Sequence, residues 1–298
     1  MDSYNHGAMP EQLIITGASG FLGGALVSAA RESWPDGRIT PLCSPRHGGL
    51  DLTRPDAAAA LSAELRIDDP RKTLLIHAAA AVRPDSAGGD AANATMAANL
   101  AGWARSAGIG FAVLVSSVSA GAPAGDGNST APTQLRSGYG TDKLAAEKIW
   151  REVLPAGKQA VVRLAGVWGW QQRPTLFWNR LLLAAARGSP PEPTPTVLRS
   201  HSKRNYISVF EASECLLRVA QNRLSGTFLA AGKDAIDTET FVRALEQLPG
   251  SRLSLEWHDD GGCDEALYPA SPELSSWLRP FAETLPAVWA KEPAWLLE

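Results

Sequence analysis

The stretch TGASGFLG, residues 16–23, separates a short apolar run from a helical stretch near the start of the chain. Glycine lets the backbone turn tightly and approach a pyrophosphate with no Cβ in the way. The phosphates then meet the N-terminus of the following helix, where free N–H groups and the helix dipole favour negative charge. Because it lies between a strand and a helix, the motif predicts a dinucleotide-binding turn; the alternative is a tight turn without a ligand. Its glycines are Gly17, Gly20 and Gly23.

Outward from this turn, apolar runs alternate with helical stretches through the first two-thirds of the chain. The pattern predicts strands over 12–16, 38–43, 49–52, 73–79, 111–117 and 159–169, and helices over 21–33, 55–66, 90–108 and 138–154. This order predicts an α/β fold: a Rossmann-type, doubly wound parallel sheet with helices on both faces. A smaller α/β substrate-binding lobe is expected to follow.

The character of the chain changes after residue 168. Residues 168–206 are rich in Trp, Arg and Pro, and SPPEPTPT (189–196) cannot form a regular helix. Patterned sequence then returns with YISV, a helix over 211–222 and strands over 226–231 and 252–257. We therefore predict a flexible leader (1–10), a dinucleotide-binding domain (11–167 plus about 205–231) and a substrate-binding lobe (168–204 plus 232–298).

The composition is that of a globular protein. Of the 298 residues, 45% are hydrophobic and 20% are charged, and the net charge is −3. Without a basic surface, we expect neither nucleic acid nor an anionic membrane as a partner. No apolar run has membrane-spanning length and the start lacks a signal core, so a cytoplasmic location is expected. The three cysteines and five histidines show no metal-ligand spacing, so no metal is expected.

The residues after the second predicted strand favour NADP over NAD, although NAD stays possible. An acidic residue there would bind the ribose 2′-OH of NAD, but CSPRHGG (43–49) has neither Asp nor Glu. Ser44 and Arg46 stand there instead, and Arg can form a forked pair with a 2′-phosphate. The alternative is that Arg46 is a solvated loop residue. Asp51 either contacts adenine or caps the helix after Arg54.

SGYGTDKLAAEKIW, residues 137–150, places Tyr139 and Lys143 four residues apart at the start of a predicted helix. Residues at this spacing share one helix face, so both side chains can point at one spot. An ammonium near a phenol favours the phenolate and lowers the phenol pKa from its ordinary value of about 10. That would give a proton donor or acceptor usable near neutral pH. On its own, the spacing also fits an ordinary surface helix.

The order of several motifs resembles the extended short-chain dehydrogenase/reductases, the NAD-dependent epimerase/dehydratase family. TGASGFLG is similar to the family's TGxxGxxG, IHAAA (76–80) to its HxAA strand end, and YGTDK to its YxxxK. VSSVSAG (115–121) looks like its serine strand end, VVRLAGVWG its VxRxxxxYG segment, and RNYISVFEA (204–212) its RxxxxVxD region. Asn93 matches the asparagine near the start of its fourth helix. The matches keep their order over roughly residues 11–230.

The resemblance implies hydride transfer between a nicotinamide and a substrate carbon. Tyr139 would be the catalytic acid or base, and Lys143 would hydrogen-bond the nicotinamide ribose and keep the pKa of Tyr139 low. Ser117 would hold the substrate oxygen, with Ser116 as the alternative. The implied cofactor contacts are Gly17, Ser19, Gly20, Phe21, Leu22, Gly23, Ser44, Arg46, Asp51, Leu52, Ala78, Ala79, Ala80, Asn93, Tyr139 and Lys143. Asn93 could instead only brace its helix, and His77 is expected in the core.

The chain departs from the family pattern after Ser117. Val118 and Ser119 stand where the sugar 4,6-dehydratases of the family carry an Asp-Glu pair, which argues against elimination. The family's usual tyrosine before the glycine near 121 is also missing. The segment before Arg204, LRSHSK, lacks the glycine-aspartate-glycine character common in nucleotide-sugar enzymes.

Aromatic and arginine residues crowd the segment after the last Rossmann strand. Aromatic side chains could wall a pocket for a ring, and arginine could meet a carboxylate or phosphate. The alternative is a packed core for the small lobe. The crowded residues are Trp168, Trp170, Gln171, Arg173, Phe177, Trp178 and Arg180. The predicted substrate contacts are Ser117, Trp168, Trp170, Trp178 and Arg204, with Tyr206 as a further candidate.

These observations predict an NADP-preferring oxidoreductase that reduces a carbonyl, or oxidises the matching alcohol, on a small or sugar-like substrate. One alternative is a nucleotide-sugar epimerase that retains NAD. Another is a non-catalytic dinucleotide-sensing protein, which would have no need of a tuned phenol. A homodimer is expected through the helices over 90–108 and 138–154.

Overall fold

The structure, a computed structural model, describes residues 10–81, 91–121, 138–170, 177–187, 197–199, 203–253, 257–259 and 267–291. Predictions for most of the leader and for the stretch 189–196 lie outside the described residues. The chain forms two compact units. Within the described residues, the first runs to Leu164 and includes Ser213–Phe228, and the second comprises Ala165–Ala212 and the chain from Leu229 onward.

A six-stranded sheet organises the first unit, in the order β2-β1-β3-β4-β5-β9. Its strands are β1 (Gln12–Thr16), β2 (Arg38–Leu42), β3 (Thr73–His77), β4 (Phe111–Ser117), β5 (Gln159–Leu164) and β9 (Gly226–Ala230). The pairings from β2 through β5 are all parallel. The chain steps to opposite sides of β1 to form β2 and β3, and open α/β sheets bind ligands at the carboxyl edge beside such a switch point. The predicted doubly wound α/β fold is confirmed.

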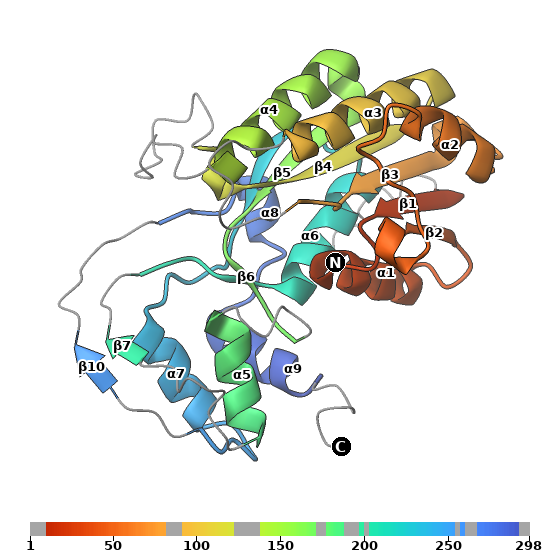
Figure 1. Ribbon diagram of the computed structural model, residues 1–298. Helices are drawn as coiled ribbons and strands as arrows, with labels where there is room; N and C mark the ends of the chain where they lie inside the picture. Colours follow the sequence, from red (N-terminus) through yellow and green to blue (C-terminus); the bar gives the residue numbers. More distant parts are fainter. Residues whose placement is uncertain are drawn as a thin grey trace. The chain divides into compact units, whose positions relative to one another are not determined.

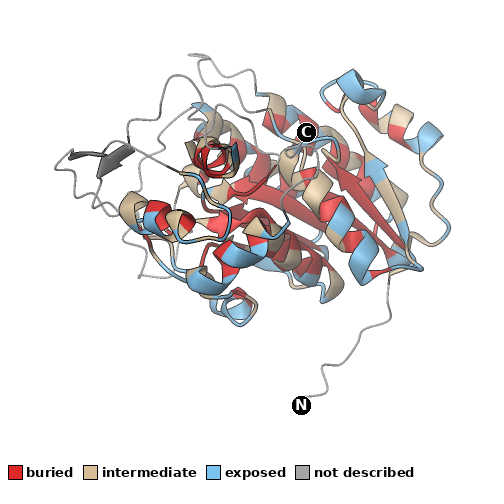
Figure 2. Ribbon diagram, turned by 90° about the horizontal axis from the view of Figure 1, so that it is seen from below, coloured by how far each residue is buried: buried red, intermediate tan, exposed pale blue. Residues whose placement is uncertain are grey.

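Helices cover both faces of this sheet (Figure 1). The helices α2 (Ala57–Glu64), α3 (Ala92–Ala107) and α4 (Gly138–Val153) lie on one face, and α1 (Phe21–Ser33) and α6 (Val209–Gln221) lie on the other. The central strands are buried along their length between these layers (Figure 2). Burial on both faces explains why these strands read as continuous apolar runs rather than as alternating ones.

Two strands predicted for the Rossmann sheet differ from the structure. No strand forms over residues 49–52, because the Asp51 side chain accepts from the backbone amide of Thr53 and closes the chain there into a turn. The predicted strand over 159–169 is split into β5 and β6 (Val167–Trp168). β6 leaves the main sheet and pairs with β8 (Ile207–Ser208) instead.

The second unit is built mainly of helices around an aromatic core. Its helices are α5 (Phe177–Arg187), α7 (Thr238–Glu246), α8 (Pro272–Ser275) and α9 (Phe281–Trp289), and β7 (Val197–Arg199) pairs in parallel with β10 (Trp257–Asp259). Trp168, Phe241 and Leu285 are among its buried core residues. Across the described residues, no helix combines the length and the apolar character needed to cross a bilayer.

Candidate functional site

The glycine turn joins β1 to α1 and packs directly against backbone. Gly17 has a φ of +73°, a conformation that other residues rarely adopt. A Cβ at Gly17 would lie 2.6 Å from the backbone nitrogen of Ala79, and a Cβ at Gly23 would lie 2.0 Å from the Gly17 carbonyl oxygen. Within the described residues no side chain caps α1, and its first turn carries no acidic residue. Its first amides and its dipole are therefore available to an anion.

A polar cluster stands beside this turn, where β2 ends. The Ser44 amide donates to the Ser19 hydroxyl (3.2 Å), and the Ser44 hydroxyl lies 3.0 Å from Nδ1 of His47. Arg46 is exposed in the 3₁₀ turn η1 (Pro45–His47). Within the described part of the chain, its guanidinium has no ion pair or hydrogen bond. Such a set of donors suits a phosphate group.

Asp51 shapes the loop that follows. Its carboxylate accepts hydrogen bonds from the hydroxyl (2.6 Å) and the amide (3.0 Å) of Thr53, and these bonds lower the pKa of Asp51. Helix α2 begins only at Ala57, so the expectation that Asp51 caps this helix is wrong. Asn99 of α3 donates to the carbonyl of Leu52 (2.9 Å) and fixes the same loop. The loop is thus held in one shape by its own side chain and by α3.

The end of β3 is fixed against the glycine turn by a buried network. The Ala79 amide donates to the Thr16 hydroxyl (3.2 Å), whose oxygen lies 2.7 Å from Nδ1 of His77. Burial, and then the positive charge of Lys143, lower the pKa of His77 to about 3. The imidazole also stacks on Trp150 at 5.9 Å between ring centroids. His77 is therefore a neutral core residue, as the sequence predicts, and it supports Ala78, Ala79 and Ala80 at the sheet edge.

Asn93 joins three elements. Its Oδ1 accepts from the Ala81 amide (3.0 Å), and its Nδ2 donates to the Ala81 carbonyl (3.1 Å) and to Asp142 (2.7 Å). Asp142, on α4, also accepts from the backbone amides of Asn93 and Ala94, both at 2.9 Å. It thereby caps α3 from a neighbouring helix. The side chain of Asn93 is fully engaged, which supports the bracing role that the sequence left open.

Tyr139 and Lys143 come together against the end of β4. The Lys143 ammonium is buried, donates to the Val115 carbonyl (3.0 Å) and lies 5.9 Å from the centre of the Tyr139 ring. Gly140 lets α4 approach this closely, because a Cβ there would lie 2.1 Å from the carbonyl oxygen of Ser119. The first turn of α4 therefore rests on the residues that follow Ser117.

The two groups are displaced in opposite directions from their ordinary pKa values. Burial, reinforced by the negative charge of Asp142, raises the pKa of Tyr139 to about 12. Burial lowers the pKa of Lys143 to about 8, against the opposing effect of Asp142 and Glu147. The sequence predicts a lowered pKa for Tyr139, and this direction is wrong for the structure. The reason is that the Lys143 ammonium donates to a strand carbonyl while the phenol is taken out of water.

The two adjacent serines have different environments. The Ser116 hydroxyl is buried and donates to Glu147, which is fully buried and paired with Arg163 at 2.8 Å. Ser117 is half-buried, and its oxygen accepts from the Ser119 amide (3.1 Å). Among the described residues, the Ser117 hydroxyl hydrogen has no acceptor. The structure thus favours Ser117 over Ser116 as a donor to a substrate.

The predicted substrate aromatics lie in the core of the second unit. Trp168 is fully buried and meets the Phe241 ring edge-on at 5.2 Å. Trp170 is buried and donates to the Val288 carbonyl (2.8 Å), and Trp178 packs on Phe241 at 4.4 Å. Such burial favours the alternative of a packed core for the lobe.

The other predicted residues of this region are less informative. Arg204 is half-buried and pairs with Ile236 in an isolated antiparallel bridge. Tyr206 packs edge-on against Trp178 at 4.3 Å, and burial raises its pKa. Gln171 and Arg173 lie outside the described residues.

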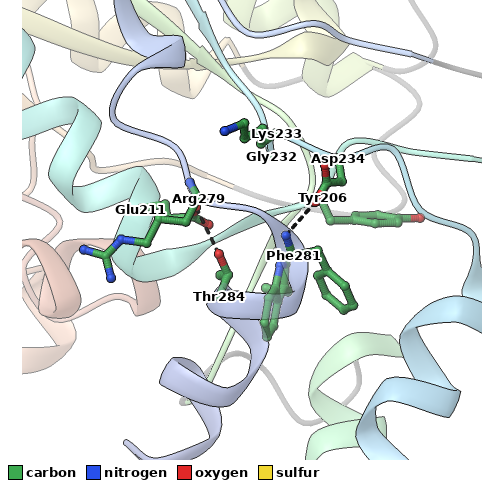
Figure 3. Close-up of a pocket in the computed structure, with 9 residues that line it drawn as sticks. Tyr206, Glu211, Gly232, Lys233, Asp234, Arg279, Phe281 and Thr284 are labelled. Atoms are coloured by element: carbon green, nitrogen blue, oxygen red, sulfur yellow. Dashed lines mark hydrogen bonds between the residues drawn. The ribbon is translucent and has the colours of Figure 1, made fainter.

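The second unit contains a small pocket that is partly open to solvent (Figure 3). Two carboxylates line it, and both bind nearby donors. Asp234 accepts from the Phe281 amide (2.7 Å), and Glu211 accepts from the Arg279 amide (3.1 Å) and the Thr284 hydroxyl (3.2 Å). These bonds hold the start of α9, so these two carboxylates serve the packing of that helix.

The sequence model of the NAD-dependent epimerase/dehydratase family matches residues 13–230. The chain belongs to this family. The match includes the glycine turn, the serine pair and the Tyr139–Lys143 pair. No curated protein matches the chain in sequence.

Solved structures of related enzymes share the fold of this family member over nearly their whole length. A dTDP-4-dehydrorhamnose reductase from Bacillus anthracis, in complex with NADP, is 18% identical with a TM-score of 0.72, over 95% of this chain and 100% of its own. A dTDP-glucose 4,6-dehydratase from the same organism, in complex with NAD, is 15% identical with a TM-score of 0.71, over 96% and 98%. A UDP-N-acetylglucosamine 4-epimerase from Bacillus cereus is 19% identical with a TM-score of 0.68, over 94% and 98%.

Three structural residues of the site were missed by sequence reasoning. Asp142 and Glu147 both lie within the quoted stretch around Tyr139, but nothing in it shows that they reach α3 and β5. Asn99 lies on a helix that the sequence predicts, but the sequence does not predict its contact with the loop near Asp51. Helical spacing from Lys143 would have placed Glu147 on the same buried face, four residues on.

Proposed function

We propose that this chain is an NADP-preferring oxidoreductase that reduces a carbonyl group, or oxidises the matching alcohol, on a small or sugar-like substrate. One observation carries the proposal: Lys143 binds the β4 backbone beside Ser117 and lies under the ring of Tyr139, at the carboxyl edge of a Rossmann sheet. Membership of the NAD-dependent epimerase/dehydratase family supports a nicotinamide cofactor.

The residues present fit such a cofactor. Side chains are absent at Gly17 and Gly23, where a Cβ would meet backbone, and the open N-terminus of α1 suits a pyrophosphate. Ser44 and Arg46 would bind a 2′-phosphate. The remaining contacts carried over from the family resemblance are Ser19, Gly20, Phe21, Leu22, Asp51, Leu52, Ala78, Ala79, Ala80, Asn93, Tyr139 and Lys143. When bound, the cofactor donates or accepts a hydride.

The chemistry assigned to the chain's own residues is proton transfer and orientation. Ser117 donates a hydrogen bond to the substrate oxygen, and Tyr139 donates its proton to the same oxygen during reduction. A phenol whose pKa is raised to about 12 is protonated at neutral pH, which is the state that reduction requires. Lys143 orients the Tyr139 ring and places a positive charge beside it. A positioned proton donor contributes roughly 10²–10⁴-fold in rate.

The substrate class is proposed as a sugar, including one linked to a nucleotide. The similar structures include a reductase of a dTDP-linked sugar and an epimerase of a UDP-linked sugar. The second of these supports the alternative function, a nucleotide-sugar epimerase that retains NAD. We also propose a homodimer formed through α3 and α4, and a cytoplasmic location.

The proposal is tested by the consumption of NADPH in the presence of nucleotide-linked keto sugars and simple ketones. We expect turnover by the wild-type protein that falls at least about 100-fold in Tyr139→Phe, because the phenol proton is lost. Tyr268→Phe, in the second unit, is the matched control and should retain turnover. Release of tightly bound NAD on denaturation, without NADPH consumption, would favour the epimerase. Equal activity of Tyr139→Phe and wild type would contradict the assigned role.

A further inference from the structure

The carboxylate of Asp142 connects α4, which carries Tyr139 and Lys143, to the start of α3. It lies in α4 between Tyr139 and Lys143, and it accepts three hydrogen bonds from α3: two backbone amides and the Asn93 side chain, at 2.7–2.9 Å. Asn93 in turn holds both polar backbone groups of Ala81, just after β3. A continuous chain of hydrogen bonds therefore runs from the loop after β3, through Asn93, to Asp142 of α4.

Asp142 is also a charged group beside the catalytic pair. The charged or titratable groups around Lys143 are Tyr139, Asp142 and Glu147 on its own helix and His77 on β3. Glu147 is paired with Arg163 of β5, at 2.8 Å, although its charge still favours the Lys143 ammonium, and His77 is neutral. Asp142 forms no ion pair within the described residues, since its partners are amide groups. Its negative charge raises the pKa of both Lys143 and Tyr139.

We propose that Asp142 is a positioning residue of the proposed reaction, which ties the first turn of α4 to the loop after β3 through Asn93 and supplies the negative charge beside Lys143. This inference rests on the proposed function of Tyr139 and Lys143. The tie keeps the phenol and the ammonium at a fixed distance from the end of β3. The charge favours the ammonium form of Lys143 and disfavours the phenolate form of Tyr139.

The test compares the wild type with Asp142→Asn, which keeps the size of the side chain and removes its charge. The matched control is Asp237→Asn, because Asp237 caps α7 by accepting from the Thr240 amide at 2.7 Å, in the second unit. Two readouts are used. The first is the pKa of Lys143 in cofactor-free protein, from the pH dependence of its acetylation by acetic anhydride. The second is the NADPH dissociation constant.

We expect the pKa of Lys143 to fall by about one unit in Asp142→Asn, because a nearby opposite charge is lost, and NADPH to bind about 5-fold more weakly. Asp237→Asn should change neither. A wild-type pKa of Lys143 together with wild-type NADPH affinity would overturn the proposal. The acetylation measurement needs no cofactor, so it tests the role of Asp142 even if NADPH does not bind the wild type. Failure of NADPH to bind the wild type would count against the proposed function alone.

A second variant, Asp142→Glu, tests the position of the carboxylate separately from its charge. It also replaces Asp142→Asn in the test if that variant does not fold. It keeps the negative charge and moves it by one methylene, so we expect a pKa of Lys143 near the wild-type value and weaker NADPH binding. Wild-type affinity for NADPH in this variant would overturn the positioning role.

Discussion

At the scale of single residues, Gly17 shows most clearly what the proposed cofactor site requires of the chain. Its positive φ and its contact with the Ala79 backbone exclude any side chain. We expect Gly17→Ala to lower the free energy of unfolding by about 1 kcal/mol for the backbone conformation and by about 1–3 kcal/mol more for the clash. It should also abolish NADPH binding. Urea denaturation and fluorescence titration measure the two effects.

Gly250 offers the matched control for this substitution. Its φ is +80°, but among the described residues, apart from its two chain neighbours, no heavy atom lies within 4 Å of the position that a Cβ would take. Gly250→Ala should therefore carry only the conformational cost and leave NADPH binding unchanged. Equal losses of stability in the two variants would show that the Gly17 contact with Ala79 has no energetic weight.

The serine pair gives a second prediction at this scale. Ser117→Ala should reduce turnover, because the donor to the substrate oxygen is lost, and should lower the free energy of unfolding by no more than about 1 kcal/mol, because only the bond from the Ser119 amide is removed. Ser116→Ala should lower the free energy of unfolding by about 1–3 kcal/mol, because it removes a donor from the buried Glu147. Thermal unfolding and initial rates together decide this. The reverse pattern would assign the substrate contact to Ser116.

At the scale of elements, the buried ion pair between Glu147 and Arg163 joins α4 to β5. Glu147→Gln would leave the Arg163 guanidinium buried without a counter-charge, and we expect a loss of about 3–5 kcal/mol in the free energy of unfolding. The control on the same helix is Glu152→Gln, which breaks only an exposed pair with Lys148 at 3.9 Å. That variant should lose no more than about 0.5 kcal/mol. Similar urea midpoints for the two variants would contradict the account.

Elements were predicted well from the sequence where the pattern is strong, and poorly where tertiary contacts decide. The boundaries of β1, α1 and β4 coincide with the predicted ranges, because apolar runs and helical periodicity fix them locally. The false strand over 49–52 arose because Asp51 and Asn99 hold that loop through contacts that no local pattern reveals. The split of the strand over 159–169 follows from the partner of β6, which comes from a distant part of the chain.

For the proposed site, sequence motifs name the candidate residues, but their environments depend on tertiary contacts. Motifs name Ser117, Tyr139 and Lys143 because their order is characteristic of the family. The direction of the Tyr139 pKa could not be predicted, because it depends on burial and on where the Lys143 ammonium points. The role of Asp142 depends on the packing of α3 against α4, which spacing along one helix does not show.

At the scale of the whole molecule, buried His77 links stability to pH. Its pKa is lowered from 6.5 to about 3 in the folded protein, so between these values the unfolded chain binds a proton that the folded one does not. The free energy of unfolding should therefore fall as the pH drops through this window, by up to about 1.4 kcal/mol per pH unit from this group.

The variant His77→Gln isolates this contribution, since glutamine does not titrate. Its absolute stability is expected to be lower, but its stability should decline less steeply than that of the wild type between pH 6.5 and 3. Urea denaturation at several pH values gives both slopes. Parallel slopes throughout that window would show that His77 is not held neutral by the fold.

The central claim is that the Rossmann unit binds a nicotinamide dinucleotide, with Arg46 selecting NADP, to perform redox chemistry. The most direct measurement is the fluorescence titration of the purified protein with NADPH and NADH, with Arg46→Ala alongside. We predict saturable binding that is tighter for NADPH, with the NADPH affinity reduced about 10-fold or more in Arg46→Ala and the NADH affinity unchanged. Failure of both dinucleotides to bind would contradict the account, because the glycine turn would then be only a turn and the proposed redox function would fall with it.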